Sequence, residues 1–288
     1  MATLGIENIS VFGLPPVEFV GLAADLRCQH ISTGLSSYPF GIADYPAFSL
    51  RDDKALRREL IAVTRDRGVS ISLGEGCTLR PGVSARDYQN DLDIFVELGA
   101  ARINTVSMDP DWSRTCDEFA VMAALTSERG LRVTTELVPG LMVCDLPTAL
   151  NVVRRVGNPE FRLLIDTMHL VRSGSVPEDI AALDPDLVDY IQICDAPREQ
   201  RFATYNEEAM FERMVPGEGE LGLAPLLAVL PVDRVYAMEV PLRAAALAGI
   251  GPHARLGRCV EATKRLLAKA HEGRIAVGGL QAAHPTVC

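Results

Sequence analysis

Short apolar runs rich in β-branched residues alternate with longer amphipathic segments along the whole chain. The short runs predict strands, and the longer segments predict helices because their apolar positions repeat with the period of one helix face. The predicted strands are residues 7–12, 29–33, 69–73, 102–107, 132–137, 162–166, 190–194 and 235–240. The predicted helices are residues 16–25, 52–67, 85–98, 113–129, 146–156, 177–183, 223–230 and 252–270.

Eight strand–helix units without a linker or a break in composition predict an α/β fold, a single-domain (β/α)8 TIM barrel. We expect the barrel to cover residues 1–272 and residues 273–288 to form a flexible C-terminal tail. A doubly wound open sheet is the alternative fold. It usually has a glycine-rich phosphate loop after its first strand, and Phe12-Gly13-Leu14-Pro15 is not such a loop.

Composition narrows the classes of partner. The 288 residues include 28 Lys and Arg against 38 Asp and Glu, a formal net charge of −10. This excess of acid disfavours a nucleic acid or an anionic membrane as partner. The seven cysteines are scattered and contain no C-x-x-C pair, which is typical of reduced thiols. No basic segment precedes an apolar run near residue 1, and no apolar stretch reaches about 20 residues, so we expect a cytoplasmic location.

Four consecutive predicted strands each end in a carboxylate or amide within an apolar stretch. Barrel enzymes build their sites at these strand ends, so the four side chains are expected to converge. Burying a carboxylate is costly unless it is paired or bound to metal, and four oxygen donors at one mouth suit a divalent cation. The four residues are Glu136, Asp166, Gln192 and Glu239.

A structural role is the alternative for two acidic residues in these segments. Asp166 is placed to cap a following helix, and Asp195 to cap its own loop. Glu136 and Glu239 precede no predicted helix start. Four such residues on adjacent strands therefore favour a functional site over a purely structural role.

The motifs at these strand ends resemble the sugar phosphate isomerase/epimerase family, the xylose isomerase-like barrels that include inosose dehydratase and 3-dehydroshikimate dehydratase. The resemblance covers nearly the whole chain by strand count, and its specific motifs lie on the last four predicted strands and their loops. These motifs are Asp166-Thr167-Met168-His169, Gln192-x-x-Asp195-Ala196-Pro197, Pro216-Gly217-Glu218-Gly219 and Glu239-Val240-Pro241.

The resemblance implies one divalent cation held by Glu136, Asp166, Gln192 and Glu239. Many members have His where this chain has Gln192. An all-oxygen ligand set favours Mn²⁺ or Mg²⁺, with Co²⁺ and Zn²⁺ left open.

Three further residues are candidate substrate contacts. By resemblance, His169 faces the substrate and contacts a hydroxyl or assists proton transfer, and Arg213 reaches a substrate oxygen or carboxylate. A His fixed by the backbone and a solvated Arg are the alternatives. Glu75, between two glycines after the third strand, is another residue of the barrel mouth. The long segment 195–220 is expected to be a lid that is mobile in the empty protein.

Such a site supports proton abstraction next to a carbonyl, with Glu136 and Glu239 as the acid–base pair and an enediolate intermediate. The resemblance favours a sugar or polyol isomerase or epimerase acting on a keto-sugar or related hydroxy-carbonyl compound. A dehydratase of the inosose or 3-dehydroshikimate type is the alternative. An endonuclease IV-like DNA enzyme is disfavoured by five histidines and the acidic charge, and a non-enzymatic binding module by the complete ligand set. The sequence leaves a homo-oligomer open.

Overall fold

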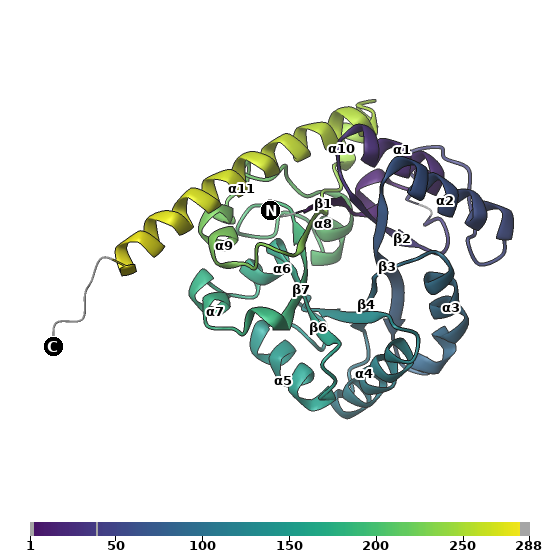
Figure 1. The fold of residues 1–288 in the computed structure, drawn as a ribbon, viewed down its shortest axis with the longest axis horizontal. Coiled ribbons are helices and arrows are strands. Elements are labelled where there is room, and N and C mark those ends of the chain that lie inside the picture. Colours follow the sequence, from purple (N-terminus) through teal and green to yellow (C-terminus); the bar gives the residue numbers. More distant parts are fainter. Residues whose placement is uncertain (1–2, 39, 283–288) are drawn as a thin grey trace.

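Eight parallel strands close into a barrel in which each strand pairs with its neighbours in chain order and β8 pairs with β1 (Figure 1). This closure excludes the open-sheet alternative. The structure is a computed structural model that describes residues 3–38 and 40–282, with the backbone alone for residues 273–282. The strands are β1 (Thr3–Ile6), β2 (His30–Gly34), β3 (Ser70–Leu79), β4 (Arg102–Ser107), β5 (Arg132–Glu136), β6 (Phe161–Asp166), β7 (Val188–Ile193) and β8 (Val235–Met238).

Helices surround the barrel and cover the outer face of the sheet (Figure 1). The α-helices are α1 (Pro16–Asp25), α2 (Lys54–Arg67), α3 (Gln89–Glu97), α4 (Trp112–Ser127), α5 (Leu146–Val156), α6 (Thr167–Arg172), α7 (Pro177–Ala181), α8 (Tyr205–Phe211), α9 (Leu223–Val229), α10 (Arg243–Leu247) and α11 (Pro252–Ala282). Three short 3-10 helices are η1 (Asn8–Val11), η2 (Ala85–Tyr88) and η3 (Pro185–Leu187). None of these helices, over the residues described, is long and apolar enough to cross a membrane.

The first strand lies before the predicted one. The prediction of a strand over residues 7–12 is wrong, because residues 3–6 pair with both β2 and β8 and the chain then turns into η1. The turn ends at Phe12, which has a left-handed φ of 51°. Glu7 therefore stands at the carboxyl end of β1, where barrel enzymes place site residues.

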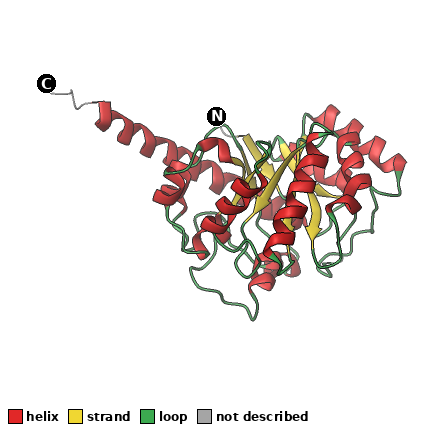
Figure 2. Cartoon of the chain, turned by 90° about the horizontal axis from the view of Figure 1, so that it is seen from below, coloured by secondary structure: helices red, strands yellow, loops and turns green. Residues whose placement is uncertain are grey.

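The chain also contains helices that the hydrophobic pattern did not predict, namely α6, α8 and α10. These helices have only five to seven residues, too few to show a clear apolar period. At the other extreme, α11 continues past residue 272 to Ala282 and extends beyond the barrel (Figure 2). The expected tail is therefore helical as far as Ala282, and residues 283–288 lie outside the described residues.

The amino end of the barrel is closed by ion pairs to the buried Asp189. Asp189 Oδ2 lies 2.7 Å from Nε of Arg102, and its Oδ1 lies 2.6 Å from Nη1 of Arg132. The Arg102 guanidinium also stacks over the Tyr190 ring inside the barrel, 5.1 Å from its centroid. This end of the barrel is therefore occupied by a structural network in which both oxygens of Asp189 are paired with arginine side chains.

We expect Asp189→Ala to lower the free energy of unfolding by about 3–5 kcal/mol, because it leaves the buried Arg102 without its partner. Asp186→Ala is the matched control, since Asp186 pairs with Arg234 at a side chain that is 82% exposed. The control is expected to change stability by less than about 1 kcal/mol. Urea denaturation measures both, and equal effects would contradict the structural role of the buried network.

Candidate functional site

The four expected ligands meet at the carboxyl end of the barrel. Glu136 ends β5, Asp166 ends β6, and Asp166 pairs in register with Gln192 of β7. Glu239 follows the last residue of β8, and its Oε1 accepts a 3.2 Å hydrogen bond from Nε2 of Gln192. Adjacent strand ends therefore bring these side chains into one group.

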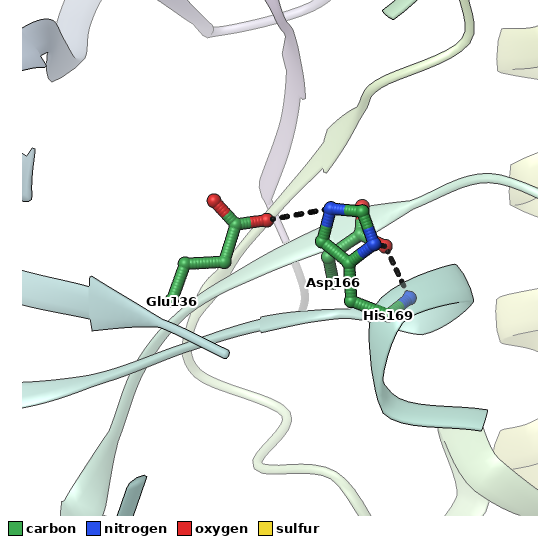
Figure 3. A group of neighbouring side chains, drawn as sticks. All are labelled: Glu136, Asp166 and His169. Carbon is green, nitrogen blue, oxygen red and sulfur yellow. Dashed lines mark hydrogen bonds and ion pairs between the residues drawn. The ribbon is translucent and has the colours of Figure 1, made fainter. Parts of the chain in front are cut away.

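Glu136, Asp166 and His169 offer ligand atoms that all lie within 4.8 Å of one another (Figure 3). Oε1 of Glu136 is 3.4 Å from Nε2 of His169, and Nδ2 of Asn104 donates to its other oxygen, Oε2, at 3.2 Å. The group is an acidic arrangement that could hold a metal ion. The group includes His169, which the sequence analysis predicts as a substrate contact and not as one of the four metal ligands.

His169 lies on α6, which begins directly at the end of β6. Asp166 caps this helix by accepting a 2.9 Å hydrogen bond from the backbone N–H of His169, which confirms the helix-cap interpretation of Asp166. Its role as a metal ligand stays a prediction. Burial lowers the pKa of His169 to about 4, against the opposing effect of Asp166. The ring is therefore neutral at neutral pH, and its Nδ1 lies 2.6 Å from the hydroxyl of Tyr205.

Arg213 bridges two of the expected ligands. Its Nη1 is 2.5 Å from Oδ2 of Asp166, and its Nη2 is 2.7 Å from Oε2 of Glu239. Its Nε donates to the backbone carbonyl of Ala209 at 2.8 Å, and the side chain is only 2% exposed. The guanidinium is thus held between β6 and β8, with most of its donors used by the protein.

Negative charge exceeds positive charge at this end of the barrel. Burial raises the pKa of Glu239 to about 8, with Asp166 and Glu7 adding to the rise and Arg213 opposing it. Burial and neighbouring carboxylates raise the pKa values of Glu136 and Glu75 well above their ordinary range. Burial also acts to raise the pKa of Asp166, but Arg213 and His169 lower it overall, so this carboxyl group stays ionised.

The residues present fit a divalent cation. One guanidinium and a neutral imidazole face several buried carboxyl groups, so an additional cation would relieve their mutual repulsion. Oε1 of Gln192 is buried and has no hydrogen-bond partner within the part of the chain that the structure describes. An unpartnered amide oxygen beside carboxylates is a hard ligand of the kind that Mg²⁺ and Mn²⁺ accept.

Glu7 is a site residue that sequence reasoning missed. Its Oε1 accepts a 2.8 Å hydrogen bond from the Tyr190 hydroxyl, which also lies 3.0 Å from Oγ of Ser72. Its Oε2 is buried without a partner among the described residues, and burial raises its pKa to about 7. The charge of Glu7 adds to the raised pKa of Glu75, so the two carboxyl groups lie near each other at this end of the barrel.

The segment 195–220 supplies two of the site contacts, Tyr205 from α8 and Arg213. Asp195 accepts hydrogen bonds from the backbone N–H groups of Gly217 and Leu221, at 2.9 and 3.2 Å. A Cβ atom on Gly219 would lie 2.3 Å from Oδ1 of Asp195. The Pro216-Gly217-Glu218-Gly219 motif therefore shapes the loop, and the mobility expected for a lid stays a prediction.

A family model described as a xylose isomerase-like TIM barrel matches residues 37–264. The chain belongs to this family. Solved structures of the same fold include the IOLI protein with a bound zinc atom, with a TM-score of 0.76 at 15% identity, covering 93% of this chain and 99% of that one. A D-allulose 3-epimerase from Methylomonas sp. aligns with a TM-score of 0.67 at 11% identity, covering 92% and 98% of the two chains.

Two curated relatives are 3-dehydroshikimate dehydratases. The Pseudomonas aeruginosa protein is 28% identical over 234 residues, which are 79% of this chain and 32% of the relative. The Pseudomonas putida protein is 26% identical over 184 residues, 59% of this chain and 29% of the relative. The chain thus spans about a third of the length of the curated relatives that it matches.

Glu7 should make stability depend on pH in the metal-free protein. Because the pKa of Glu7 rises from 4.5 to about 7, the folded protein keeps a proton that the unfolded chain releases as the pH increases between these values. The free energy of unfolding therefore falls over this range, and Glu7→Gln is expected to remove roughly 1–3 kcal/mol of that fall.

Urea denaturation at pH 5 and pH 8 with a chelator measures this change. The exposed Glu18→Gln is the control, and we expect it to keep the pH dependence of the original protein. A Glu7→Gln variant with the same pH dependence as the control would contradict the buried, protonated state of Glu7.

Proposed function

We propose that the protein is a divalent-metal-dependent enzyme that removes a proton next to a carbonyl group of a hydroxylated small molecule, with loss of water as the overall outcome. The observation that carries this proposal is the surplus of carboxylates at the carboxyl end of the barrel, where Glu136 and Glu239 have raised pKa values. The curated dehydratase relatives support elimination of water as the outcome.

The cation would be held by Glu136, Asp166, Gln192 and Glu239, and this oxygen set favours Mn²⁺ or Mg²⁺. When bound, it would polarise the substrate carbonyl and neutralise the charge that develops on its oxygen. The zinc atom in the IOLI structure supports a cation site in this fold.

Two carboxyl groups of the chain would move the proton. Glu136 and Glu239 reach the site from opposite sides of β6 and β7, so a substrate between them would meet one on each face. A raised pKa suits this role, since proton transfer is most effective when the pKa of the group lies near the working pH.

The remaining residues would orient the reacting groups. Arg213 holds the outer oxygens of Asp166 and Glu239, which fixes both carboxylates relative to each other. His169 presents a neutral ring beside Glu136, in reach of a substrate hydroxyl or carbonyl oxygen. Glu75 and Glu7, which line the other side of the barrel end, would accept hydrogen bonds from substrate hydroxyl groups or donate them when protonated.

An isomerase or epimerase acting on a keto-sugar is the second candidate, and the fold shared with D-allulose 3-epimerase favours it. The first step is the same. Return of the proton from the opposite carboxyl group would give an epimer, return at the neighbouring carbon an isomer, and departure of a β-hydroxyl an alkene.

Incubation in D₂O with 3-dehydroshikimate, inososes and ketoses, followed by NMR, tests the proposal. We expect deuterium next to the carbonyl of recovered substrate or product, and the product separates the two candidates. Glu136→Gln and Glu239→Gln should each lower the rate about 10²–10⁴-fold, because each removes a carboxyl group that transfers the proton. Glu128→Gln, at a side chain that is 70% exposed, is the control and should keep full activity. Turnover that continues at the same rate under excess chelator would contradict a metal-dependent reaction.

A further inference from the structure

Tyr190 crosses the interior of the barrel and connects β7 with β1. Its side chain is fully buried, and its hydroxyl donates a 2.8 Å hydrogen bond to Oε1 of Glu7. The same hydroxyl lies 3.0 Å from Oγ of Ser72 on β3. The Arg102 guanidinium lies over the Tyr190 ring, and Nη1 of Arg102 donates to the Ser72 carbonyl at 2.8 Å. Both ends of the tyrosine side chain are therefore held, so its hydroxyl occupies a fixed position.

Tyr190 contacts Glu7 from the amino side of the proposed metal ligands. Successive side chains of a strand point to opposite faces, so Tyr190 stands one inward-facing position before Gln192 on β7. Glu7 lies at the level of Glu239, because its backbone N–H donates to the carbonyl of Met238 at 3.0 Å. Tyr190 therefore holds Oε1 of Glu7 from deeper in the barrel, away from the carboxyl end where barrel enzymes bind their substrates.

Oε2 is the oxygen of Glu7 that the protein leaves unused. The Glu7 side chain is fully buried, and Oε2 has no hydrogen-bond partner in the part of the chain that the structure describes. A buried polar atom without a partner is costly, so a ligand that supplies the missing hydrogen bond would gain affinity there. A hydroxyl group suits Oε2 whether or not Glu7 carries a proton, because a hydroxyl both donates and accepts hydrogen bonds.

The place of Glu7 in the ring of strands indicates which part of a substrate it would meet. The four proposed metal ligands come from β5 to β8, whereas Glu7 follows β1, which lies outside that arc and opposite β5 in the closed barrel. A cation that chelates the carbonyl and a neighbouring hydroxyl would hold the reacting end of the substrate beside β5 to β8. The rest of the substrate would then extend towards β1.

We propose that Glu7 is a specificity-determining residue whose Oε2 binds a substrate hydroxyl beyond the two oxygens held by the cation, and that Tyr190 is a positioning residue that fixes Glu7 for this contact. The inference rests on the proposed function and narrows its substrate class. The substrate is a polyhydroxylated carbonyl compound with at least one hydroxyl group besides the one next to the carbonyl. A compound that carries only an α-hydroxyl group would leave Oε2 without a partner.

Binding of xylitol and 1,2-pentanediol to the Mg²⁺-loaded full chain tests this inference. The two molecules have carbon chains of the same length and offer the cation the same vicinal pair of hydroxyl groups, but only xylitol has a hydroxyl group on every carbon. Ligand-observed NMR titration measures both dissociation constants. We expect the Kd of xylitol to be about 10–100-fold lower than that of 1,2-pentanediol, because xylitol can also bond to Glu7.

Glu7→Leu removes the carboxyl group, and we expect it to raise the Kd of xylitol about 10–100-fold while the Kd of 1,2-pentanediol stays unchanged. Tyr190→Phe removes the hydroxyl that holds Oε1. It should raise the Kd of xylitol roughly 3–10-fold, with no further rise when it is combined with Glu7→Leu. Tyr88→Phe is the matched control, because it removes a hydroxyl that donates to the Thr78 carbonyl at 2.7 Å outside the site, and it should leave both Kd values unchanged.

Equal affinities of the unmodified protein for the two molecules, or no binding of xylitol with or without Mg²⁺, would overturn the inference. A similar rise of both Kd values in Glu7→Leu and Tyr190→Phe would also overturn it, since that result indicates a purely structural role. If Glu7→Leu does not fold, the selective loss of xylitol affinity in Tyr190→Phe decides alone. Failure of the unmodified protein to bind a divalent cation would instead refute the proposed function, while xylitol titrations of the metal-free variants would still test Glu7.

Discussion

Uncompensated negative charge at the carboxyl end of the barrel is the constraint on which the rest of the site depends. Parallel strands that close into a barrel bring their carboxyl ends together. Here the last residues of β5 and β6 are acidic, and Glu7 and Glu239 come just after β1 and β8. Arg213 is the cation in contact with Asp166 and Glu239, and it cannot balance all of these groups. Burial raises the pKa values of Glu7, Glu136 and Glu239, and neighbouring carboxylates add to the rise; protons or a bound cation would relieve this unmatched charge.

At the opposite end of the barrel, the charged side chains lie in direct ion pairs. There Asp189 is held between Arg102 and Arg132, and the three side chains form a closed structural network. The stabilising ion pairs therefore lie at the amino end of the barrel, and the candidate site lies at its carboxyl end. The loop after β7 strengthens this separation, because Arg213 fixes two carboxylates and Tyr205 contacts His169, while Asp195 accepts the backbone hydrogen bonds that shape the loop itself.

The barrel and four of the site residues could be predicted because both follow from patterns that span several residues. Eight apolar runs with helices between them specify the fold, and their carboxyl ends locate Glu136, Asp166, Gln192 and Glu239. Glu7 was missed because the apolar residues after it predicted a strand over residues 7–12, which placed Glu7 at the start of that strand. In the structure these residues form η1, and Glu7 follows the end of β1. Tyr205 was missed because α8 has only seven residues inside a polar loop, and a contact with His169, 36 residues away in sequence, leaves no local signal.

A crystal structure of the protein soaked with Mn²⁺, with anomalous scattering used to locate the ion, tests the central claim most directly. The account predicts a single anomalous peak bound by oxygens of Glu136, Asp166, Gln192 and Glu239, with Arg213 still paired to the outer carboxylate oxygens and Nε2 of His169 outside the coordination sphere. An ion bound elsewhere, or the absence of any peak among these four residues at saturating Mn²⁺, would contradict it.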